Sequence, residues 1–118
     1  MKRLQPESRI QRGVIAYLRA VGLVPVHVPN GSKLAGTPEQ RARTGARLKA
    51  DGLMPGFPDL LVYASDGRVG HMEIKAEANY QQDTQKACAA LLARLGHHYA
   101  VVRSIDDARE TLEEWGWI

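Results

Sequence analysis

The stretch of residues 56–75, GFPDLLVYASDGRVGHMEIK, decides the fold. It contains two apolar runs, residues 59–64 and residues 69–75, which are rich in residue types that favour strands. Ser65-Asp66-Gly67 separates the runs, and such a cluster of turn residues is typical of a hairpin loop. The sequence therefore predicts two adjacent antiparallel strands joined by this loop.

Charged residues stand at the open end of this hairpin, where a strand in a sheet should be apolar. Asp59 begins the first strand, and Glu73 and Lys75 end the second. Because side chains alternate along a strand, Glu73 and Lys75 share one face, and buried charges there need partners or a metal. Two carboxylates favour Mg²⁺ or Mn²⁺, and a lysine beside them can assist an attacking water. The alternative is a cross-strand ion pair between Lys75 and one carboxylate.

The length of the loop decides whether the two acids meet. A two-residue turn pairs Asp59 with Ile74, which places Asp59 and Glu73 on opposite faces of the sheet. A three-residue loop pairs Asp59 with Glu73, and loops of this length commonly end in a left-handed glycine, as Ser65-Asp66-Gly67 does. A metal site at the two acids therefore requires the three-residue loop or a β-bulge.

Apolar patterns on both sides of the hairpin predict the remaining elements. Apolar residues at helical spacing predict helices, and short apolar runs predict strands. The predicted helices span residues 6–21, 81–95 and 104–114, a polar surface helix is predicted at residues 38–50, and further strands span residues 24–28 and 98–103. Ser104-Ile105-Asp106-Asp107 is expected to form a capping box that begins the last helix. The apolar stripe of the helix at residues 81–95 is expected to contain Ala87, Cys88, Leu91, Leu92 and Leu95. This order predicts one mixed α/β domain over residues 1–118, with a central sheet of about four strands.

Composition excludes several classes of protein. A chain of 118 residues and 13.0 kDa has room for one domain, and 44% hydrophobic with 25% charged residues is typical of a soluble globular protein. The sequence has no apolar run of the ~20 residues that a membrane span needs, and residues 1–7 contain no apolar signal core. The single cysteine, Cys88, excludes an internal disulfide and a zinc site built on several thiolates. We therefore expect a cytoplasmic protein that does not interact with membranes.

Positive charge is concentrated in the first half of the chain. Residues 1–50 contain ten Lys and Arg and two acids, a net charge of +8, whereas residues 51–118 contain six Lys and Arg and eleven acids, a net charge of −5. A basic half predicts a surface for a polyanion, although runs of charge are also typical of solvated helix faces. The basic residues expected to contact phosphates are Lys33, Arg41, Arg43, Arg47 and Lys49.

The hairpin motif is similar to a known nuclease signature. Gly56-Phe57-Pro58-Asp59, followed by Glu73-Ile74-Lys75, resembles the PD-(D/E)xK nuclease signature. The wider frame resembles the VRR-NUC domain, the virus-type replication-repair nuclease branch of that superfamily, and it adds Glu7, Asn30-Gly31, Gln85 and the strand from Tyr99 to Ser104. The resemblance spans nearly the whole chain and implies a stand-alone VRR-NUC protein, of the kind that phages often encode.

The resemblance implies a fold, a metal and a role for each matching residue. The implied fold is the restriction-endonuclease-like αβββαβ core, a four-stranded mixed sheet with helices on both faces, with residues 38–50 as an insertion. The implied cofactor is Mg²⁺ or Mn²⁺, held by Asp59, Glu73 and the backbone carbonyl of Ile74. The other implied roles are catalytic lysine for Lys75, support of Lys75 or a water for Gln85, and an accessory role for Glu7, whose alternative role is to complement the helix dipole.

These features together predict a divalent-metal-dependent endodeoxyribonuclease that acts on branched DNA or four-way junctions. The alternatives are a general endonuclease or nickase, and a non-catalytic nucleic-acid-binding module whose acids are locked in ion pairs. Cutting two strands needs two sites, and the apolar residues Trp115, Trp117 and Ile118 predict a homodimer; the alternative is that the tryptophans pack on the sheet. Phe57 and Tyr80 are expected to pack within the protein; the alternative is that they stack on bases.

Overall fold

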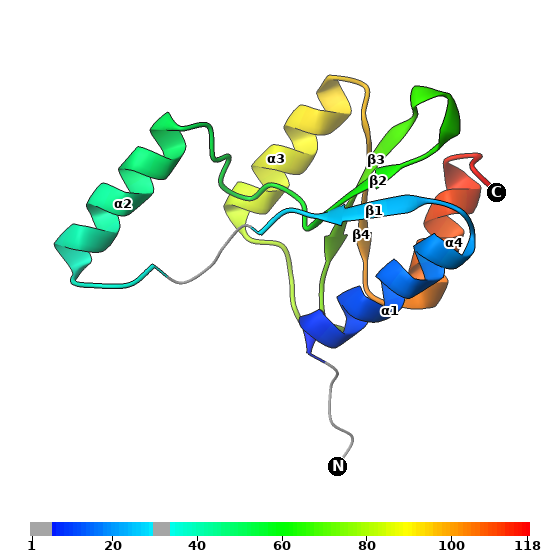
Figure 1. Ribbon diagram of the computed structural model, residues 1–118, viewed down its shortest axis with the longest axis horizontal. Helices are drawn as coiled ribbons and strands as arrows, with labels where there is room; N and C mark the ends of the chain where they lie inside the picture. Colours follow the sequence, from blue (N-terminus) through cyan, green and yellow to red (C-terminus); the bar gives the residue numbers. More distant parts are fainter. Residues whose placement is uncertain (1–5, 30–33) are drawn as a thin grey trace, which may run out of the picture.

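A computed structural model describes residues 6–29 and 34–118 of the chain. They form a four-stranded sheet in the order β1-β2-β3-β4 with helices on both faces (Figure 1). The elements are α1 (Glu7–Ala20), β1 (Val24–His27), α2 (Pro38–Ala50), β2 (Leu60–Tyr63), β3 (Val69–Ile74), α3 (Asp83–Arg94), β4 (His98–Val102) and α4 (Ile105–Glu114). Strand β2 pairs antiparallel with β1 on one side and with β3 on the other, and β4 pairs parallel with β3. The predicted mixed sheet and αβββαβ order are confirmed, with α2 inserted and α4 added.

The loop between β2 and β3 has the three residues that the metal-site hypothesis requires. The register pairs Leu60 with Met72, so that one residue further Asp59 lies opposite Glu73. The last two residues of the 65–67 loop have left-handed φ values of 66° and 75°. They are an aspartate and a glycine, and both residue types tolerate this conformation. The three-residue loop is thus confirmed, and it brings the two acids to one face.

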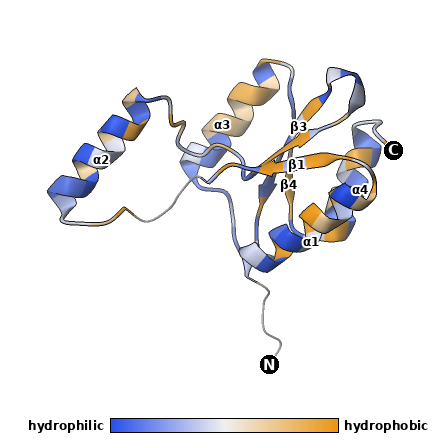
Figure 2. Cartoon of the chain, in the orientation of Figure 1, coloured by the Kyte–Doolittle hydropathy of each residue, from blue (hydrophilic) through white to orange (hydrophobic). Residues whose placement is uncertain are grey.

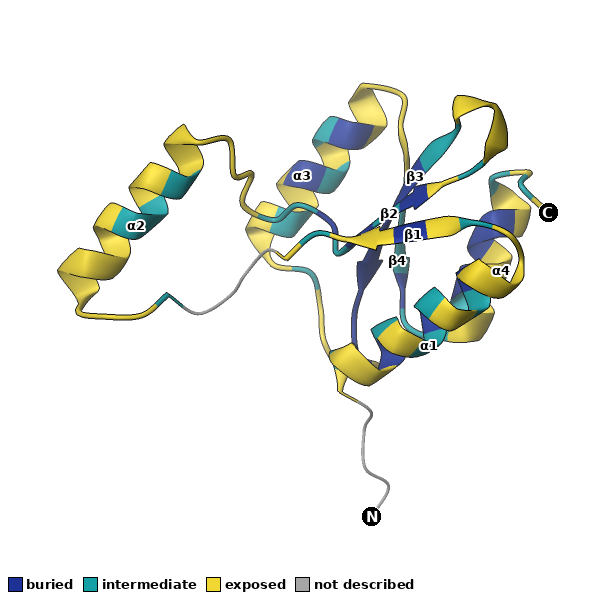
Figure 3. Cartoon of the chain, in the orientation of Figure 1, coloured by how far each residue is buried: buried dark blue, intermediate teal, exposed yellow. Residues whose placement is uncertain are grey.

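One face of the sheet packs an apolar core against α1 and α4. Alternate strand residues point into this core and are almost fully buried, and the two helices contribute residues at helical spacing. Figure 3 shows this buried layer in dark blue, and Figure 2 shows that the same segments are apolar. The main contributors are Leu60, Val62, Met72 and Ile74 from the strands, Ile10, Val14 and Leu18 from α1, and Ala108 and Leu112 from α4. Burial of apolar area is the dominant favourable contribution to folding, so this face stabilises the fold.

Helix α3 covers part of the opposite face, the face that carries Glu73. Its buried residues are Cys88 and Leu92, and the predicted apolar stripe is therefore too wide, because Ala87 and Leu95 are exposed. Among the helices and strands, α3 contacts chiefly β4, so the side of the helix that faces away from the sheet stays in solvent. A single helix on a four-stranded sheet leaves part of this face open.

Helix α2 stands apart from the sheet (Figure 1). It begins after Thr37, whose hydroxyl accepts from the Gln40 amide while the Gln40 side chain accepts from the Thr37 amide, which is a capping box. None of its residues is buried. The predicted polar surface helix at residues 38–50 is confirmed. In the described part of the chain, neither this helix nor any other is long and apolar enough to cross a membrane.

The C-terminal tryptophans pack against the end of the sheet. Trp115 stacks on His98 with ring centroids 5.0 Å apart, and Trp117 contacts Trp115 at 4.9 Å. A side chain at Gly70 would overlap the Trp115 ring, so glycine is required there. The tryptophans therefore pack on the sheet, which was the alternative to their use in a dimer interface. The homodimer stays a prediction, without support from these residues.

Candidate active site

Asp59 lies just before β2 and is held by both neighbouring strands. Its carbonyl accepts from the Val28 amide at 2.8 Å and contacts His27 Nδ1 at 3.0 Å. Its carboxylate Oδ2 accepts from the Ile74 amide at 2.7 Å. A charge-assisted bond of this kind holds the carboxylate in one orientation, so the first motif acid is positioned by the sheet itself.

The loop before Asp59 is pressed against the first turn of α3. At Gly56 the backbone φ is +78°, and a Cβ there would overlap the backbone of Thr84. Glycine is required on both grounds, conformation and close approach. This contact ties the strand that carries Asp59 to the helix that carries Gln85, so the motif glycine helps to set the distance between two predicted site residues.

Glu73 is almost fully buried, with 2% of its surface exposed. Its Oε1 accepts from Gln85 Nε2 at 3.3 Å, whereas its Oε2 has no hydrogen-bond partner among the described residues. Burial, and then the adjacent Asp59 carboxyl, raise the pKa of Glu73 far above its usual range, and the Lys75 charge offsets only part of this rise. A buried carboxylate oxygen without a donor is costly, so this position favours a proton or a cation.

Lys75 shares the face of Glu73 but is not paired with it. Its side chain is buried, with 7% of the residue exposed. Within residues 6–29 and 34–118, ion pairs join only Arg109 to Asp106 and Glu113. The alternative interpretation, in which Lys75 is locked to one of the two carboxylates, is therefore not supported by the described residues.

The backbone of Ile74 faces the first motif acid. The N–H and C=O of one residue in a strand point to the same edge. Because the Ile74 N–H donates to Asp59 Oδ2, the Ile74 carbonyl lies on that edge as well. Its side chain points into the core on the other face, where it is 1% exposed. This placement suits the predicted third ligand.

Glu7 contacts the loop that follows Lys75. Its Oε1 accepts from Asn79 Nδ2 at 3.0 Å and from the Ala76 amide at 3.4 Å. No group of three or more His, Cys, Asp or Glu side chains in the described ranges could hold a metal. The visible role of Glu7 is thus to position this loop, and its accessory catalytic role stays a prediction.

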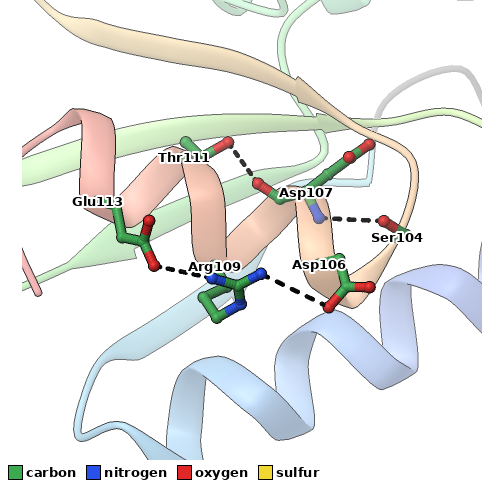
Figure 4. A network of polar contacts seen from close by, with 6 residues as sticks. All are labelled: Ser104, Asp106, Asp107, Arg109, Thr111 and Glu113. Atoms are coloured by element: carbon green, nitrogen blue, oxygen red, sulfur yellow. Dashed lines mark hydrogen bonds and ion pairs between the residues drawn. The ribbon is translucent and has the colours of Figure 1, made fainter.

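Arg103 holds the same loop from the other side, and sequence reasoning missed it. Its Nη1 donates to the carbonyls of Ala76 at 2.7 Å and Asn79 at 2.6 Å. The turn that carries it is fixed at the start of α4, where Asp107 is bonded to Ser104 through its amide (Figure 4). The Asp107 carboxylate accepts from the Arg103 amide at 2.9 Å and not from Ser104, so the predicted capping box is only half formed. No motif in the sequence indicates this role.

A second pair missed by sequence reasoning joins the start of α3 to β4. Gln81 Nε2 donates to the Tyr99 hydroxyl at 2.7 Å. Burial, and then the Glu73 charge, raise the pKa of Tyr99, which places its hydroxyl near the acids. On the same face, Phe57 packs edge to face on His71, with ring centroids 5.9 Å apart, as expected for a packing residue.

A cleft of about 320 Å³ lies between the acids and the segment around α2. Asp59, Glu73 and Gln85 line one side, and Leu48 and Lys49 line the other. The cleft therefore brings one predicted phosphate-binding residue, Lys49, to the same space as three predicted catalytic residues.

The other predicted phosphate-binding residues lie away from this lining. Arg41, Arg43 and Arg47 are exposed on α2, and Arg43 and Arg47 share a face because they are one turn apart. Lys33 and Asn30-Gly31 lie outside the described residues. The exposed arginines extend the basic surface from the cleft along α2.

The donor set fits Mg²⁺ or Mn²⁺. Mg²⁺ is usually bound by one or two carboxylates, with water and substrate phosphate as the remaining ligands. Asp59 and Glu73 face each other in register, and the buried Oε2 of Glu73 needs a cation or a proton. The residues present are therefore of the kind and number that such an ion takes.

Comparison with solved structures identifies the fold. One structure, described as "VRR_NUC domain", has a TM-score of 0.66 at 21% sequence identity and covers 92% of this chain and 96% of its own. The fold is that of VRR-NUC domains. A second structure, described as "VRR_NUC domain protein", has a TM-score of 0.65 at 20% identity, over 96% of this chain and 89% of its own. No model of a known family matches the sequence, and no curated protein is similar to it. The resemblance inferred from the motifs is confirmed for the fold.

Proposed function

We propose that this protein is a divalent-metal-dependent nuclease that hydrolyses phosphodiester bonds in DNA. The observation that carries the proposal is the facing pair Asp59 and Glu73 beside the buried Lys75. Among the described residues, Glu73 Oε2 has no hydrogen-bond partner and Lys75 has no ion pair. A purely structural cluster of charges would satisfy its own atoms, whereas perturbed groups at a cleft are typical of active sites. The VRR-NUC fold supports the same proposal.

The groups of the chain have separate roles in this reaction. Asp59, Glu73 and the Ile74 carbonyl would hold the ion, which when bound neutralises charge on the phosphoryl oxygens and makes a water more acidic. Lys75 orients the attacking water and stabilises the negative charge that develops on the phosphate. Gln85 holds Oε1 of Glu73, which leaves Oε2 for the ion. The resemblance implies products with 5′-phosphate and 3′-hydroxyl ends.

The proposed substrate is branched DNA, such as a four-way junction. Lys49 would contact phosphates at the cleft, and Arg41, Arg43 and Arg47 would contact phosphates further along α2. Phosphate contacts carry no direct sequence information, so we expect cleavage without sequence preference. A homodimer would place two such sites on one junction, and light scattering should then give a mass twice the 13.0 kDa of the chain.

A cleavage assay over branched, nicked and linear DNAs tests the proposal. The protein should cut with Mg²⁺ or Mn²⁺ and not with EDTA. Lys75→Ala should lower the rate by about 10²–10³-fold, the loss typical of removing one charge-stabilising donor. Lys86→Ala, which removes an exposed lysine of α3, should cut normally. Binding of these DNAs without cleavage by the natural protein would instead indicate a non-catalytic binding module, and equal cleavage of all of them a general endonuclease.

A further inference from the structure

Tyr80 is the most exposed aromatic residue in the described part of the chain. It is 83% exposed, compared with 43% for Tyr63, so the expectation that Tyr80 packs within the protein is wrong. Its ring and hydroxyl make no hydrogen bond or ring contact with the described residues. Aromatic side chains contribute most when buried, and a ring left in water therefore suggests a partner outside the chain.

The exposure of Tyr80 does not result from a loosely anchored loop, because hydrogen bonds anchor both of its neighbours in the chain, Asn79 and Gln81. Before it, Asn79 is bonded through its side chain to Glu7 and through its carbonyl to Arg103. After it, the Gln81 side chain is bonded to Tyr99 at 2.7 Å. The ring thus projects from a backbone fixed by α1, by β4 and by the turn after β4. A side chain held in this way loses little further conformational entropy on binding.

Tyr80 lies close along the chain to a residue that lines the active-site cleft. It lies between Lys75 and Gln85 in sequence, and Gln82, two residues on, lines the cleft. Two residues span at most about 7 Å of chain, which is about the length of one nucleotide. Tyr80 therefore lies within about 7 Å, measured along the chain, of a residue that lines the cleft.

The chemistry of the loop favours contact with a base and not with a phosphate. Residues 76–85 contain no Lys or Arg, and they include the acids Glu77 and Asp83. Such a segment repels phosphates, whereas an aromatic ring stacks on the face of any base. In a duplex both faces of each base are already covered by neighbouring bases, so a lone ring needs an unpaired or terminal base.

We propose that Tyr80 stacks on an unpaired nucleobase beside the cleaved phosphate and so directs cleavage to DNA with single-stranded character. This inference rests on the proposed nuclease function and assigns a specificity-determining residue to the same cleft. The basic surface of α2 then supplies affinity for any DNA, and Tyr80 supplies the preference for a base with a free face.

Fluorescence anisotropy with labelled DNA, with Ca²⁺ in place of Mg²⁺, tests the assignment. Two probes are compared: a duplex with a short single-stranded flap and the fully paired duplex of the same sequence. Tyr80→Ala should weaken binding to the flap roughly 5- to 150-fold, the range expected for one lost base stack, and binding to the duplex less than about twofold. Tyr80→Phe and Tyr80→Trp, which keep a ring, should bind the flap normally.

Tyr63→Ala provides the matched control, since it removes an exposed tyrosine from the end of β2 opposite to the end that follows Asp59. It should change neither affinity. A 2-aminopurine placed at the first unpaired position should change its fluorescence with the natural protein and not with Tyr80→Ala.

The outcomes separate this inference from the function on which it rests. Equal flap binding by Tyr80→Ala and the natural protein would overturn the assignment while leaving nuclease activity in place, and so would equal losses on flap and duplex. No binding or cleavage of either probe by the natural protein would overturn the proposed function and the inference together.

Discussion

The two faces of the sheet differ in the side chains that they bury, and β3 shows this difference within one strand. Met72 and Ile74 point to the α1–α4 face and join an apolar core, whereas His71, Glu73 and Lys75 point to the α3 face, where they are also buried. One face is closed by two helices, and the other is covered only in part and ends in a cleft. The apolar face thus stabilises the fold, whereas the other face contains buried charges that cost stability. Substitutions on the apolar face should therefore mainly lower stability, and substitutions on the charged face should mainly lower activity.

The largest effect on stability is expected from the apolar face. Leu18→Ala removes a fully buried side chain from α1 and should lower the free energy of unfolding by about 2–5 kcal/mol. Val21→Ala, at the exposed position that follows the same helix, should cost under about 1 kcal/mol. Urea denaturation monitored by circular dichroism measures both. Similar losses in the two variants would show that the core is not concentrated on this face.

Binding of a metal should stabilise the protein through the charged face. Mn²⁺ at 100 times its dissociation constant should add about 2.7 kcal/mol to the free energy of unfolding. Because burial and Asp59 raise the pKa of Glu73, the ion must displace a proton, and its affinity should increase with pH through the neutral range. Thermal denaturation with and without Mn²⁺ at several pH values measures this. An affinity independent of pH would contradict the protonated state of the acid pair.

Glu73→Gln should show the reverse of the usual effect of a buried substitution. The folded protein holds the Glu73 proton more tightly than the unfolded chain, so this residue contributes stability at low pH that is lost as the pH rises towards the raised pKa. Without the metal, the variant should therefore be more stable than the natural protein at neutral pH, by on the order of 1–2 kcal/mol, with a gap that grows as the pH increases.

Glu77→Gln, an exposed acid in the next loop, serves as the control for Glu73→Gln and should show no such gap. Glu73→Gln should also lose the stabilisation by Mn²⁺. If Glu73→Gln is less stable than the natural protein at neutral pH, the folded protein favours the ionised form of Glu73 and not the protonated form.

The smallest effect on the fold is expected from α2. Replacing Arg41, Arg43 and Arg47 together with Ala should leave the unfolding midpoint unchanged, because all three are exposed. The salt dependence of DNA binding should become shallower, by roughly one unit of log–log slope for each lost phosphate contact. Arg12→Ala with Arg19→Ala, two exposed changes on α1, provides the comparison. An unchanged slope in the α2 variant would show that this helix does not reach DNA.

The hairpin was the most predictable part of the site. Alternation along residues 69–75, together with the three residues of the loop, is sufficient to place Asp59 opposite Glu73, and the observed register agrees. The apolar stripe of α3 was less predictable, because spacing shows which residues share a face but not how much of that face a neighbour covers. The same limit applied to Tyr80, whose aromatic character suggested burial although the loop around it holds it in solvent.

By itself the sequence determined the mixed α/β class, the order of the elements and the shared face of Glu73 and Lys75, since these depend on short-range patterns of two to four residues. Only the tertiary structure decided that Glu7 bonds to the loop of Asn79, at 72 residues' separation, and that Arg103 also holds that loop. It also decided that Glu73 Oε2 has no donor among the residues that the structure describes. These facts depend on how distant elements pack and which side chains they bring within about 3 Å. No periodicity within one segment carries that information.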